Sequence, residues 1–551
     1  MSNLLVAGAK IVPVEFDYVV VGAGAAGCVL AGRLAAARPR LSVLLIEYGG
    51  RAVNPLLHIP KGFYYTLRGD RYLYRYETRP VTPDGENEVW LRGRVLGGSA
   101  AVNGMMWMRG AQADWDGLAA RGNQGWSWAD ALPAYKAMEN HNLGPSATRG
   151  AGGPLGVSVT PTRDEVTNAI LASAVKHGWE HVTDANASDG ERIAFTPSTI
   201  WEGRRTTSYD AFVRPARADG RRAGHRNLTV ATRTRVGHLL FDGRRVIGVR
   251  VRGSSRSLRD ITARKEVIVC AGAVETPLLL ERSGIGRPEV LSAAGIAPRI
   301  ESPNVGERVI EQRGIALQVT LDADRVAAIK LSTRRGQAAE VLRYLRSGQG
   351  LLATAGYDLV CQFKSAPHQP RPDVQGLFAP MALDTSSSHL KLARHPGILF
   401  MAYPLRPQTR STVHVSGQDP DDPPVIDPRF LETEADRGAV APVLEIARQL
   451  LATSPVGDLI AGEEFPGPSV TTREQAVRYS LTAGTGIYHA VGAAAMGVNA
   501  EDATDPQLRV RGADGLRVAD ASVLPFQLSG NTAAPAMLVG YRAADLILGE
   551  L

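Results

Sequence analysis

Three glycines and one acidic residue near the start of the chain have the types and spacing of a phosphate-binding turn. Gly22, Gly24 and Gly27 form the pattern Gly-x-Gly-x-x-Gly, and Glu47 follows about 20 residues later. The first glycine permits a tight turn, the second lets the backbone approach a pyrophosphate, and the third lets a helix pack closely on a strand. Glu47 can bind both hydroxyls of a ribose, which disfavours a 2′-phosphate. These residues predict a dinucleotide site and leave open whether the dinucleotide is FAD or NAD.

The elements around these residues are those that such a turn requires. Residues 16–21 are rich in β-branched and aromatic side chains, which is typical of a buried parallel strand. Residues 28–37 form a helical stretch, and residues 42–47 form a second strand. The start of the helix offers free N–H groups and the positive end of its dipole to the phosphates. In this strand–helix–strand context the glycine motif is far more specific than it would be alone.

A second glycine-rich stretch lies at residues 92–110, which read RGRVLGGSAAVNGMMWMRG. The segment from Gly97 to Gly104 is too polar and too rich in glycine for a core strand. Such a loop can approach a ligand closely with its backbone donors. By composition alone, these residues fit a structural turn as well as a ligand loop.

Residues 266–286, EVIVCAGAVETPLLLERSGIG, repeat the order of strand, tight turn and helix. Further strands are predicted at 227–230 and 245–251, just ahead of this unit.

The C-terminal stretch also begins with a strand, at residues 516–518, which leads to Asp520. A loop follows, and then a helix with Asn531 or Thr532 at its N-cap and Pro535 in its first turn.

Composition excludes several classes of protein. The chain has 551 residues, with 62 Lys and Arg against 55 Asp and Glu. This length exceeds one compact core, so we expect two domains or one large elaborated unit. The basic residues are scattered and not interleaved with aromatic residues, so no nucleic-acid partner is predicted.

The three cysteines, Cys28, Cys270 and Cys361, are widely separated and odd in number. This pattern argues against a disulfide framework and predicts no metal site, because no CxxC spacing occurs. No run of about 18 apolar residues free of charge appears, and the first residues do not resemble a cleaved leader. We therefore expect a cytoplasmic protein with no membrane partner.

The motifs together resemble the glucose–methanol–choline (GMC) family of FAD-dependent oxidoreductases. The matching stretches are GAGAAG, RVLGGSAAVNGMMWMRG, GAVETPLLLERSGIG, HAVGAAAMG, and LRVADASVLP with SGNTAAP, in family order over most of the chain. The resemblance implies the GMC fold, an α/β (α+β) architecture in which a Rossmann-like FAD-binding domain is interrupted by an antiparallel-sheet substrate domain. The implied FAD-binding domain spans 14–155, 204–312 and 510–551, and the substrate domain spans 156–203 and 313–509.

The same resemblance implies which residues hold FAD. They lie in or near the loops just quoted, and they are Gly22, Gly24, Ala25, Ala26, Gly27, Glu47, Arg94, Val95, Gly97, Gly98, Ser99, Asn103, Gly104, Met105, Met106, Val236, Ala271, Gly272, Tyr488, Asp520, Ala521, Asn531, Thr532 and Ala533. Some relatives bind FAD covalently through a histidine in the Gly-Gly-Ser loop. Val102 stands at that position here, so FAD is expected to be held non-covalently.

His489, in GTGIYHAVG, and Asn531, in SGNTAAP, match the family's active-site pair. Removal of the hydroxyl proton of an alcohol eases the loss of hydride from its carbon, and a histidine with a pKa of about 6.5 accepts a proton at neutral pH. Asn531 can hydrogen-bond the substrate oxygen and orient the carbon toward the flavin N5, which receives the hydride. The last helix would stabilise the negative charge of the reduced flavin.

Two stretches depart from the family pattern. After His489 the family usually has Pro-x-Gly-Thr-Cys-Arg-Met-Gly, whereas residues 490–497 here read AVGAAAMG. Polar residues that would orient the histidine are therefore missing. The run NVGERVIEQ at 304–312 ends in Glu311-Gln312 in place of the family's Asp-His. We expect neither change to touch the catalytic pair, and both to affect efficiency and substrate class but not the fold.

The predicted function is oxidation of a small-molecule alcohol to an aldehyde or ketone, with dioxygen or another electron acceptor to reoxidise the flavin. Trp107 and the aromatic residues of a lid-like segment at 49–90, Phe63, Tyr64 and Tyr65, favour an aryl or other apolar primary alcohol. This segment also fits a solvated surface loop. A choline-type alcohol dehydrogenase is the alternative, because aromatic faces attract quaternary ammonium groups.

Other classes of function share parts of this sequence pattern. A hydroxynitrile lyase and a light-driven decarboxylase use the same fold, and a nicotinamide dehydrogenase shares the first glycine turn. A non-catalytic binding protein is the fourth alternative, because of the altered run Ala493-Ala494-Ala495. The sequence does not distinguish an oxidase from a dehydrogenase, and it leaves the oligomeric state open.

Overall fold

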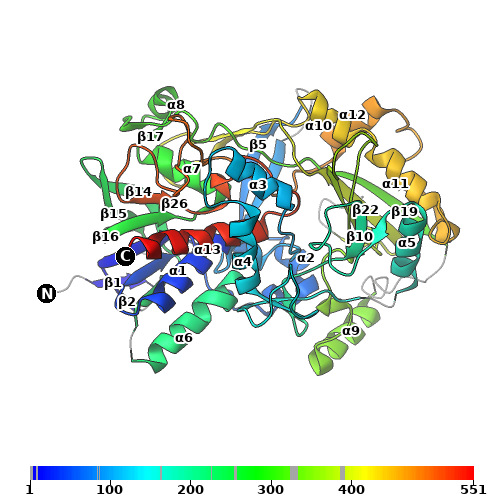
Figure 1. The fold of residues 1–551 in the computed structure, drawn as a ribbon, viewed down its shortest axis with the longest axis horizontal. Coiled ribbons are helices and arrows are strands. Elements are labelled where there is room, and N and C mark those ends of the chain that lie inside the picture. The colour runs from blue at the N-terminus through cyan, green and yellow to red at the C-terminus, as the bar shows by residue number, and fades with distance from the viewer. Residues whose placement is uncertain are drawn as a thin grey trace.

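Two seven-stranded sheets, at opposite ends of the long axis of the molecule, organise the chain (Figure 1). The structure is a computed structural model, and the residues it describes are 4–7, 10–82, 85, 87–161, 164–224, 226–253, 257–322, 333–384 and 391–551. The first described strand, β1 (Leu4–Ala7), and the C-terminus lie on the side of the first sheet (Figure 1).

The first sheet contains the dinucleotide turn. Its strand order is β13-β4-β3-β16-β15-β14, and β26 pairs with β16 off this path. The strands are β3 (Glu15–Val21), β4 (Val43–Ile46), β13 (Leu228–Ala231), β14 (Arg235–Asp242), β15 (Arg245–Arg252), β16 (Leu258–Val269) and β26 (Leu516–Val518). From β13 to β16, and from β16 to β26, neighbours run parallel, whereas β14, β15 and β16 are antiparallel. The apolar runs of β3 and β4 are therefore those of buried parallel strands.

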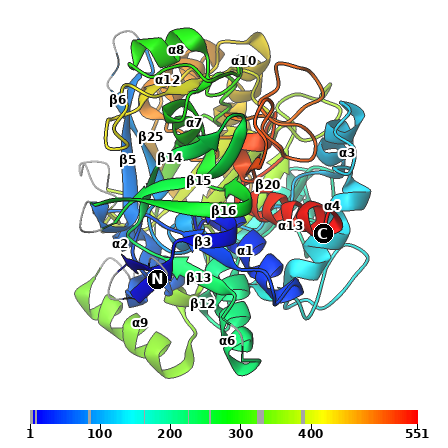
Figure 2. The ribbon, with the colours of Figure 1, turned by 90° about the vertical axis from the view of Figure 1, so that its left-hand side faces the viewer.

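The C-terminal helix lies against the helix of the dinucleotide turn (Figure 2). These helices are α13 (Ala533–Gly549) and α1 (Ala25–Ala37). A Cβ at Gly540 would lie 2.3 Å from the carbonyl oxygen of Ala26, so the two backbones touch there. The guanidinium of Arg33 donates to the carbonyl oxygen of Tyr541 at 2.6 Å and to Asp545 at 2.8 Å. This contact fixes the residues just ahead of α13 relative to the dinucleotide turn.

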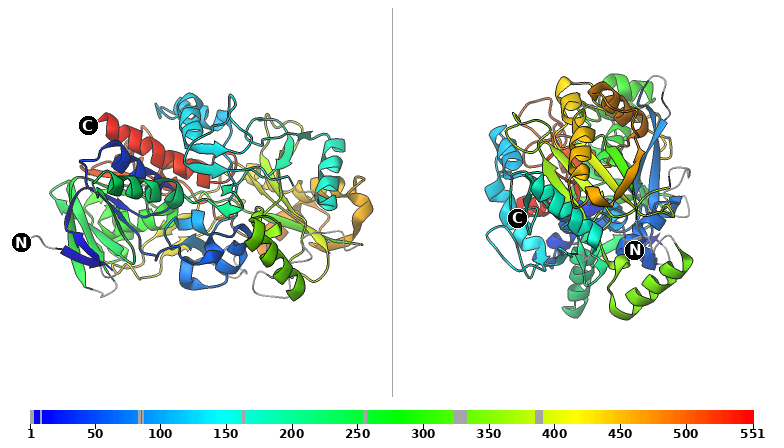
Figure 3. Two further views of the ribbon diagram at one scale, coloured as in Figure 1. Left: turned by 90° about the horizontal axis from the view of Figure 1, so that it is seen from below. Right: turned by 90° about the vertical axis from the view of Figure 1, so that its right-hand side faces the viewer.

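The second sheet has the strand order β25-β19-β22-β21-β20-β10-β9 and is antiparallel except between β10 and β9. Its strands are β9 (Glu180–His181), β10 (Arg192–Phe195), β19 (Ile315–Leu321), β20 (Leu359–Phe363), β21 (Val374–Ala379), β22 (Gly397–Pro404) and β25 (Ile460–Phe465). Helices α5 (Glu165–Lys176), α11 (Val443–Ala452) and α12 (Arg473–Ala483) lie at this end of the molecule (Figure 3).

The two faces of the second sheet pack on different parts of the chain. Apolar residues of α5 and α11 form one core with one face of the sheet. On the other face, Val360, Leu377 and Tyr403 pack with Met106 and Met108 of the second glycine-rich stretch. The second face is therefore the one that the sheet presents toward the candidate site.

Shorter elements connect the sheets. The remaining helices are α2 (Phe63–Thr66), α3 (Gln112–Ala120), α4 (Trp128–Met138), α6 (Arg214–Arg222), α7 (Gly272–Arg282), α8 (Pro288–Ala293), α9 (Arg334–Ser347) and α10 (Glu434–Val440). The remaining strands form two-stranded pairs, and they are β1 (Leu4–Ala7), β2 (Lys10–Pro13), β5 (Leu73–Pro80), β6 (Asn87–Gly93), β7 (Glu139–His141), β8 (Leu155–Val157), β11 (Ile200–Trp201), β12 (Arg204–Arg205), β17 (Ile285–Gly286), β18 (Ile300–Glu301), β23 (Thr412–His414) and β24 (Val425–Asp427).

The predicted fold class is confirmed: a Rossmann-like parallel core is combined with a second, mostly antiparallel sheet. The strands and helices predicted around the motifs are present, whereas β14 was not predicted from the sequence. The strands of the first sheet come from 15–46, 228–269 and 516–518, and those of the second lie between 180 and 465 outside these ranges. The exact domain boundaries stay a prediction.

The contact between α13 and α1 leads to a test of stability. Gly540→Ala places a methyl group 2.3 Å from a backbone oxygen. We expect a loss of about 1–3 kcal/mol in the free energy of unfolding, because the helices must separate to admit it. Urea denaturation of the purified protein measures this loss.

Gly438→Ala in α10 is the matched control, because a Cβ at Gly438 meets nothing within 4 Å. Alanine is the better helix former, so this variant should be as stable as the wild type or gain up to about 1 kcal/mol. Equal stability of the two variants would contradict the close contact of α13 with α1.

Candidate active site

The three glycines of the first turn have different surroundings. Gly22 has a φ of +104°, and a Cβ there would lie 2.3 Å from the carbonyl oxygen of Cys270. A Cβ at Gly27 would lie 2.0 Å from the Gly22 carbonyl oxygen, whereas a Cβ at Gly24 would meet nothing within 4 Å. Gly22 and Gly27 therefore permit the turn and its close packing. Gly24 borders open space at the start of α1, where the phosphates of a dinucleotide can bind.

Glu47, directly after β4, holds this turn in place. Its Oε2 accepts from the N–H of Ala23 at 3.1 Å, and its Oε1 accepts from the N–H of Gly49 at 2.7 Å. The side chain is buried, and this burial raises the pKa of Glu47 to about 7. Each carboxylate oxygen can accept a second hydrogen bond, so Glu47 can also bind ribose hydroxyls.

The second glycine loop packs directly on the first turn. The N–H of Gly97 donates to the carbonyl oxygen of Ala23 at 2.8 Å, and a Cβ at Gly98 would lie 2.6 Å from the Cα of Gly24. A Cβ at Gly104 would meet nothing within 4 Å, so this loop also borders open space. The two loops therefore form neighbouring walls of one cradle, although they are far apart in the sequence.

Arg205, which sequence reasoning missed, holds the second loop from the inside. Its buried guanidinium donates to the carbonyl oxygens of Ala100 at 3.1 Å and of Asn103 at 2.7 Å, and to the Asn103 side-chain oxygen at 2.7 Å. The same Asn103 oxygen accepts from the N–H of Met105 at 3.0 Å. Three acceptors on one guanidinium fix the path of this loop. The signal in the sequence was weak, because Arg205 stands in a polar run that also fits a surface loop.

Asp520 joins the start of α7, which forms a third wall of the cradle, to the C-terminal loop. Its Oδ2 accepts from the N–H of Gly272 at 2.8 Å and from the hydroxyl of Thr276 at 2.6 Å. Its Oδ1 accepts from the N–H of Ser522 at 2.8 Å. A Cβ at Gly272 would meet nothing within 4 Å, so this wall borders open space as Gly24 and Gly104 do.

Most other residues predicted to hold FAD lie on the same elements. Ala25 and Ala26 open α1, Ala271 is the N-cap of α7, Ala521 opens a short 3₁₀ helix, Thr532 is the N-cap of α13 and Ala533 opens it. Arg94, Val95, Ser99 and Met106 belong to the second loop and its approach, and Val95 forms an isolated bridge with Gly50.

Val236 and Tyr488 are the two outlying members of the predicted set. Val236 lies on β14, next to Arg235, whose guanidinium carbon is 4.7 Å from the centre of the Tyr48 ring. The N–H of Thr234, two residues before Val236, donates to the carbonyl oxygen of Glu47 at 3.0 Å, so the start of β14 lies beside the residue predicted to bind the ribose. Tyr488 has a φ of +64° and is 41% exposed. This left-handed turn directs the next residue, His489, into the interior.

The structure brings His489 and Asn531 together. The Nδ2 of Asn531 donates to the Nε2 of His489 at 3.1 Å, although the two residues are on different segments. His489 follows α12 in a loop, and Asn531 lies just ahead of the N-cap of α13. Because Asn531 directly precedes α13, the packing of α13 on α1 holds Asn531 against His489.

The expectation that Glu311 and Gln312 do not touch the pair is wrong. The Oε1 of Gln312 lies 2.7 Å from the Nδ1 of His489, and the Nε2 of Gln312 donates to the carbonyl oxygen of Leu405 at 3.1 Å. Because a carbonyl only accepts, the Gln312 amide turns its oxygen toward the imidazole, and Nδ1 must carry a proton. The Nε2 of His489 is therefore the unprotonated, basic nitrogen, and it accepts from Asn531.

Glu311 clamps the backbone of the same loop. Its Oε1 accepts from the N–H of His489 at 2.7 Å, and its Oε2 accepts from the N–H of Ala490 at 3.0 Å and from Arg92 at 3.2 Å. Gln527 donates to the carbonyl oxygen of His489 at 2.6 Å. These bonds replace the polar partners that the sequence suggested were missing. Both replaced residues, Glu311 and Gln312, therefore orient the histidine directly.

The altered run Ala493-Ala494-Ala495 is buried, and its backbone joins two other segments. The carbonyl oxygen of Ala493 accepts from Gly306, and the N–H of Ala494 donates to Ser522. The three small side chains pack in the core, and a methyl group cannot donate a hydrogen bond to His489. The orientation of His489 is thus set by the 311–312 segment.

Burial first, and the positive charge of Arg92 second, lower the pKa of His489 to about 3. The imidazole is consequently neutral at neutral pH. A neutral histidine with one protonated nitrogen is a proton acceptor at its other nitrogen. The arrangement can therefore take a proton from a hydroxyl group that lies between Nε2 and the Asn531 amide.

The aromatic residues predicted to line a pocket differ in how far they are buried. Trp107 was expected to be a pocket wall, but it is fully buried in the core, donates to Glu139 at 2.6 Å and packs edge-on against Tyr135. Phe63 is buried, and the ring of Phe63 would lie 3.0 Å from a Cβ at Gly356. Of the lid-like aromatic residues, only Tyr65 is exposed in the manner of a surface loop.

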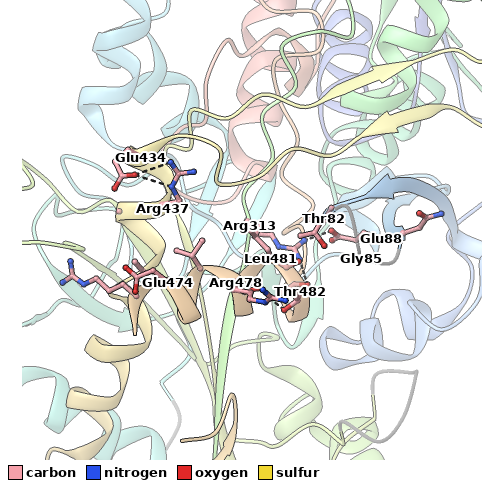
Figure 4. Close-up of a pocket in the computed structure, with 17 residues that line it drawn as sticks. Thr82, Gly85, Glu88, Arg313, Glu434, Arg437, Glu474, Arg478, Leu481 and Thr482 are labelled. Atoms are coloured by element: carbon pink, nitrogen blue, oxygen red, sulfur yellow. Dashed lines mark hydrogen bonds and ion pairs between the residues drawn. The ribbon is translucent and has the colours of Figure 1, made fainter. Parts of the chain in front are cut away.

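A pocket of about 1020 Å³ is lined by residues of α10 and α12 and by Glu88 and Arg313 (Figure 4). The Arg313–Glu88 pair, 2.6 Å apart, and the Arg437–Glu434 pair, 3.3 Å apart, lie on different sides of it. Glu88 also accepts from the hydroxyl of Thr485 and from the N–H of Gly486. The charges on this side therefore support the loop that carries His489 from the outside and are not directed at the catalytic pair.

Among the described residues, no helix is both long and apolar enough to cross a membrane. All three cysteines are buried and free. No group of three or more potential metal ligands occurs in the described part of the chain.

Comparison with known proteins identifies the family. The N-terminal and C-terminal models of the GMC oxidoreductases match residues 16–312 and 407–540. The chain is 35% identical to an uncharacterized GMC-type oxidoreductase of Mycobacterium tuberculosis over 97% of this chain and 99% of that protein. It is 32% identical to the mitochondrial choline dehydrogenase of Homo sapiens, over 97% and 90%. The crystal structure of pyridoxine 4-oxidase from Mesorbium loti superposes with a TM-score of 0.86, at 25% identity over 97% and 99%.

The chain belongs to the GMC oxidoreductase family. It is an FAD-dependent oxidoreductase that acts on alcohol-type CH–OH donors. The cradle fits this cofactor, because the added-Cβ positions at Gly24, Gly104 and Gly272 all border open space while the surrounding backbones are in contact. Glu47 and the start of α1 supply the groups that a ribose and a pyrophosphate require.

Gly24→Val tests this fit. The new side chain meets no protein atom within 4 Å at its Cβ, so the flavin-free protein should keep its unfolding temperature. The valine occupies the space at the start of α1, so the ratio of bound flavin to protein should fall several-fold. The ratio of flavin to protein absorbance after purification measures the loss.

The contrasting variant is Gly27→Ala, whose methyl group would lie 2.0 Å from a backbone oxygen. It should lower both the flavin content and the stability of the flavin-free protein. Full flavin content in Gly24→Val would contradict the assignment of Gly24 to the phosphate site.

Proposed function

We propose that this protein oxidises an aryl or other apolar primary alcohol, with His489 as the base and Asn531 as the donor to the substrate oxygen. The observation that carries the proposal is the 3.1 Å bond between Asn531 Nδ2 and His489 Nε2, since both atoms can contact one hydroxyl oxygen. The basic nitrogen accepts the hydroxyl proton, and the amide N–H stabilises the negative charge that develops on the oxygen.

Bound, non-covalent FAD supplies the acceptor for the hydride that leaves the alcohol carbon. The chain's own groups do the rest of the work. Gln312 keeps Nδ1 protonated, so that Nε2 is available as the base, and the Glu311 clamp holds the His489 backbone in place. The N-terminus of α13, directly after Asn531, adds a positive potential that favours negative charge nearby. The product is an aldehyde or, from a secondary alcohol, a ketone.

Apolar and aromatic residues near the pair support an aryl or apolar substrate. The rings of Tyr403 and His489 are 5.6 Å apart and nearly perpendicular. Tyr403 packs in one cluster with Met106 and Leu377, and Tyr357 and Ile487 lie against that cluster. A choline-type substrate is the second candidate. It is favoured by the human choline dehydrogenase relative and by the attraction of aromatic faces for quaternary ammonium groups.

Anaerobic bleaching of the flavin tests this proposal. The purified protein is mixed with benzylic, furanic, aliphatic, amino and sugar alcohols and with choline, and the flavin absorbance is followed before and after air is admitted. We expect benzylic or other apolar primary alcohols to bleach it fastest. Fast recovery in air defines an oxidase and slow recovery a dehydrogenase. Absence of bleaching by every alcohol would refute the proposal and favour a lyase or a binding role.

His489→Ala should keep FAD bound but slow flavin reduction by about 10²–10⁴-fold, because a positioned base contributes about that much. Stopped-flow absorbance under anaerobic conditions gives the rate constant. His181→Ala, an exposed histidine on β9, is the control and should reduce the flavin at the wild-type rate. A wild-type rate in His489→Ala would contradict the proposed base.

The pH dependence follows from the low pKa of His489, which burial and Arg92 lower to about 3. A lowered pKa keeps the imidazole neutral at every pH above it. The rate constant of flavin reduction should therefore be constant from about pH 5 to about pH 8. A fall in rate centred near about pH 6.5, the ordinary pKa of histidine, would show that His489 is not shielded in this way.

A further inference from the structure

Four polar side chains form a continuous row across the second sheet and end at the catalytic pair. Arg192, Gln362, Gln375 and Tyr403 stand on four neighbouring strands, and each is the direct cross-strand partner of the next. All four are buried. They lie on the face that packs against Met106. Gln362 and Gln375 are each two residues from an apolar residue of that face, Val360 or Leu377, and side chains two residues apart in a strand point to the same side. Polar residues in such apolar strands need partners, and they find them in one another.

The hydrogen bonds of this row run in one direction. Arg192 donates to the Oε1 of Gln362 at 2.7 Å, and the Nε2 of Gln362 donates to the Oε1 of Gln375 at 2.9 Å. The Nε2 of Gln375 then donates to the Oδ1 of Asn531 at 3.1 Å and to the hydroxyl oxygen of Tyr403 at 2.5 Å. Each glutamine amide therefore donates a hydrogen bond to the oxygen of the next amide.

Arg192 sets this direction because a guanidinium donates and never accepts. Reversal of the row would turn the Gln362 amide nitrogen toward Arg192 and bring two donors face to face. Arg192 is also held from behind, since it donates to the carbonyl oxygens of Ala185 at 2.8 Å and Gly190 at 2.7 Å. Its charge persists at neutral pH, because burial lowers its pKa only to about 10.

The direction of the row decides which end of the Asn531 amide faces the substrate. With its Oδ1 occupied by Gln375, Asn531 turns its Nδ2 toward His489. A flipped Asn531 would aim a carbonyl oxygen at the oxygen of the alcohol. That oxygen would repel the negative charge that forms as the proton leaves, instead of stabilising it.

We propose that Arg192, Gln362 and Gln375 are positioning residues that force Asn531 to present its amide N–H to the oxygen of the substrate. This inference rests on the proposed function, since it needs an alcohol oxygen between Asn531 and His489. It assigns a role in the reaction to three side chains of the second sheet that contact neither reacting atom. These side chains act only through the direction in which each hydrogen bond of the row is donated.

Gln375→Glu is the sharpest test, because a carboxyl group donates when protonated and only accepts when ionised. At low pH the introduced acid can donate to Asn531 as the glutamine does. As the pH rises and the acid ionises, Asn531 must turn its nitrogen toward it and its oxygen toward the substrate. We expect the rate of flavin reduction to fall about 10²-fold with rising pH, against a flat profile in the wild type.

Gln375→Met removes both the hydrogen-bond donor and the acceptor of the amide and should slow flavin reduction about 10-fold at every pH. Gln318→Met on β19 is the matched control, because Gln318 is a buried glutamine of the same sheet that bonds to Leu383 and Glu464 instead. It should reduce the flavin within about two-fold of the wild-type rate. If Gln375→Glu does not fold, Gln362→Met tests the same row one step further from the site.

A double-mutant cycle with Asn531→Ala shows whether the row acts through Asn531. The pH-dependent loss of Gln375→Glu should vanish in the Asn531→Ala background, because no amide is left to turn. The same loss in both backgrounds would overturn the inference. So would a flat pH profile in the folded single variant Gln375→Glu.

An independent readout needs no alcohol. The ¹⁵N chemical shifts of the His489 ring in the FAD-loaded protein report which nitrogen carries the proton. The wild type should show a protonated Nδ1 and a bare Nε2, and ionised Gln375→Glu should shift the proton population toward Nε2. Unchanged shifts would overturn the inference. If no alcohol bleaches the wild-type flavin, the proposed function fails, and these shifts still decide whether the row sets the polarity of Asn531.

Discussion

Buried hydrogen-bonding groups must find partners, and the rest of this site depends on that constraint. His489 is surrounded by amides and by one carboxylate, and each of them can satisfy its neighbours in only one orientation. Leu405, whose carbonyl only accepts, fixes one end of this set through Gln312. Arg192, which only donates, fixes the other end. Between these two ends no amide is free to flip, so the basic nitrogen of His489 and the N–H of Asn531 face the same space.

Close backbone contacts bring these groups to the flavin cradle. Gly22 and Gly27 let α1 start directly against β3, and Gly98 lets the second loop touch the first at Gly24. The contact of α13 with α1 then carries Asn531 to the edge of the cradle. Each of these contacts needs the absence of a side chain, so glycines concentrate where the cofactor and the catalytic pair meet. In the proposed mechanism the first sheet thus provides the cofactor site, and the second sheet sets the orientation of the Asn531 amide beside His489.

The departures from the family pattern have a physical explanation once the contacts are visible. Small alanines replace polar residues at 493–495 and pack in the core, while Glu311 and Gln312 hold the histidine by its backbone and its ring. A glutamine beside a buried imidazole adds no charge, so it leaves the low pKa of His489 to burial and to Arg92. The chain therefore keeps His489 neutral and in a defined tautomer by a different set of partners.

The sequence by itself determined the dinucleotide turn and the order of strands and helices around it, because these depend on local periodicity and on glycine spacing. The fold class and the family followed from the resemblance of its motifs to those of the GMC family. It also singled out His489 and Asn531, through short motifs. Only the tertiary structure decided that Gln312 contacts His489, that Arg205 supports the second loop, and that Trp107 belongs to the core. The row from Arg192 to Gln375 was likewise invisible, since cross-strand register is set by packing between strands that are far apart in the chain. Polar residues inside apolar strands were its only trace in the sequence.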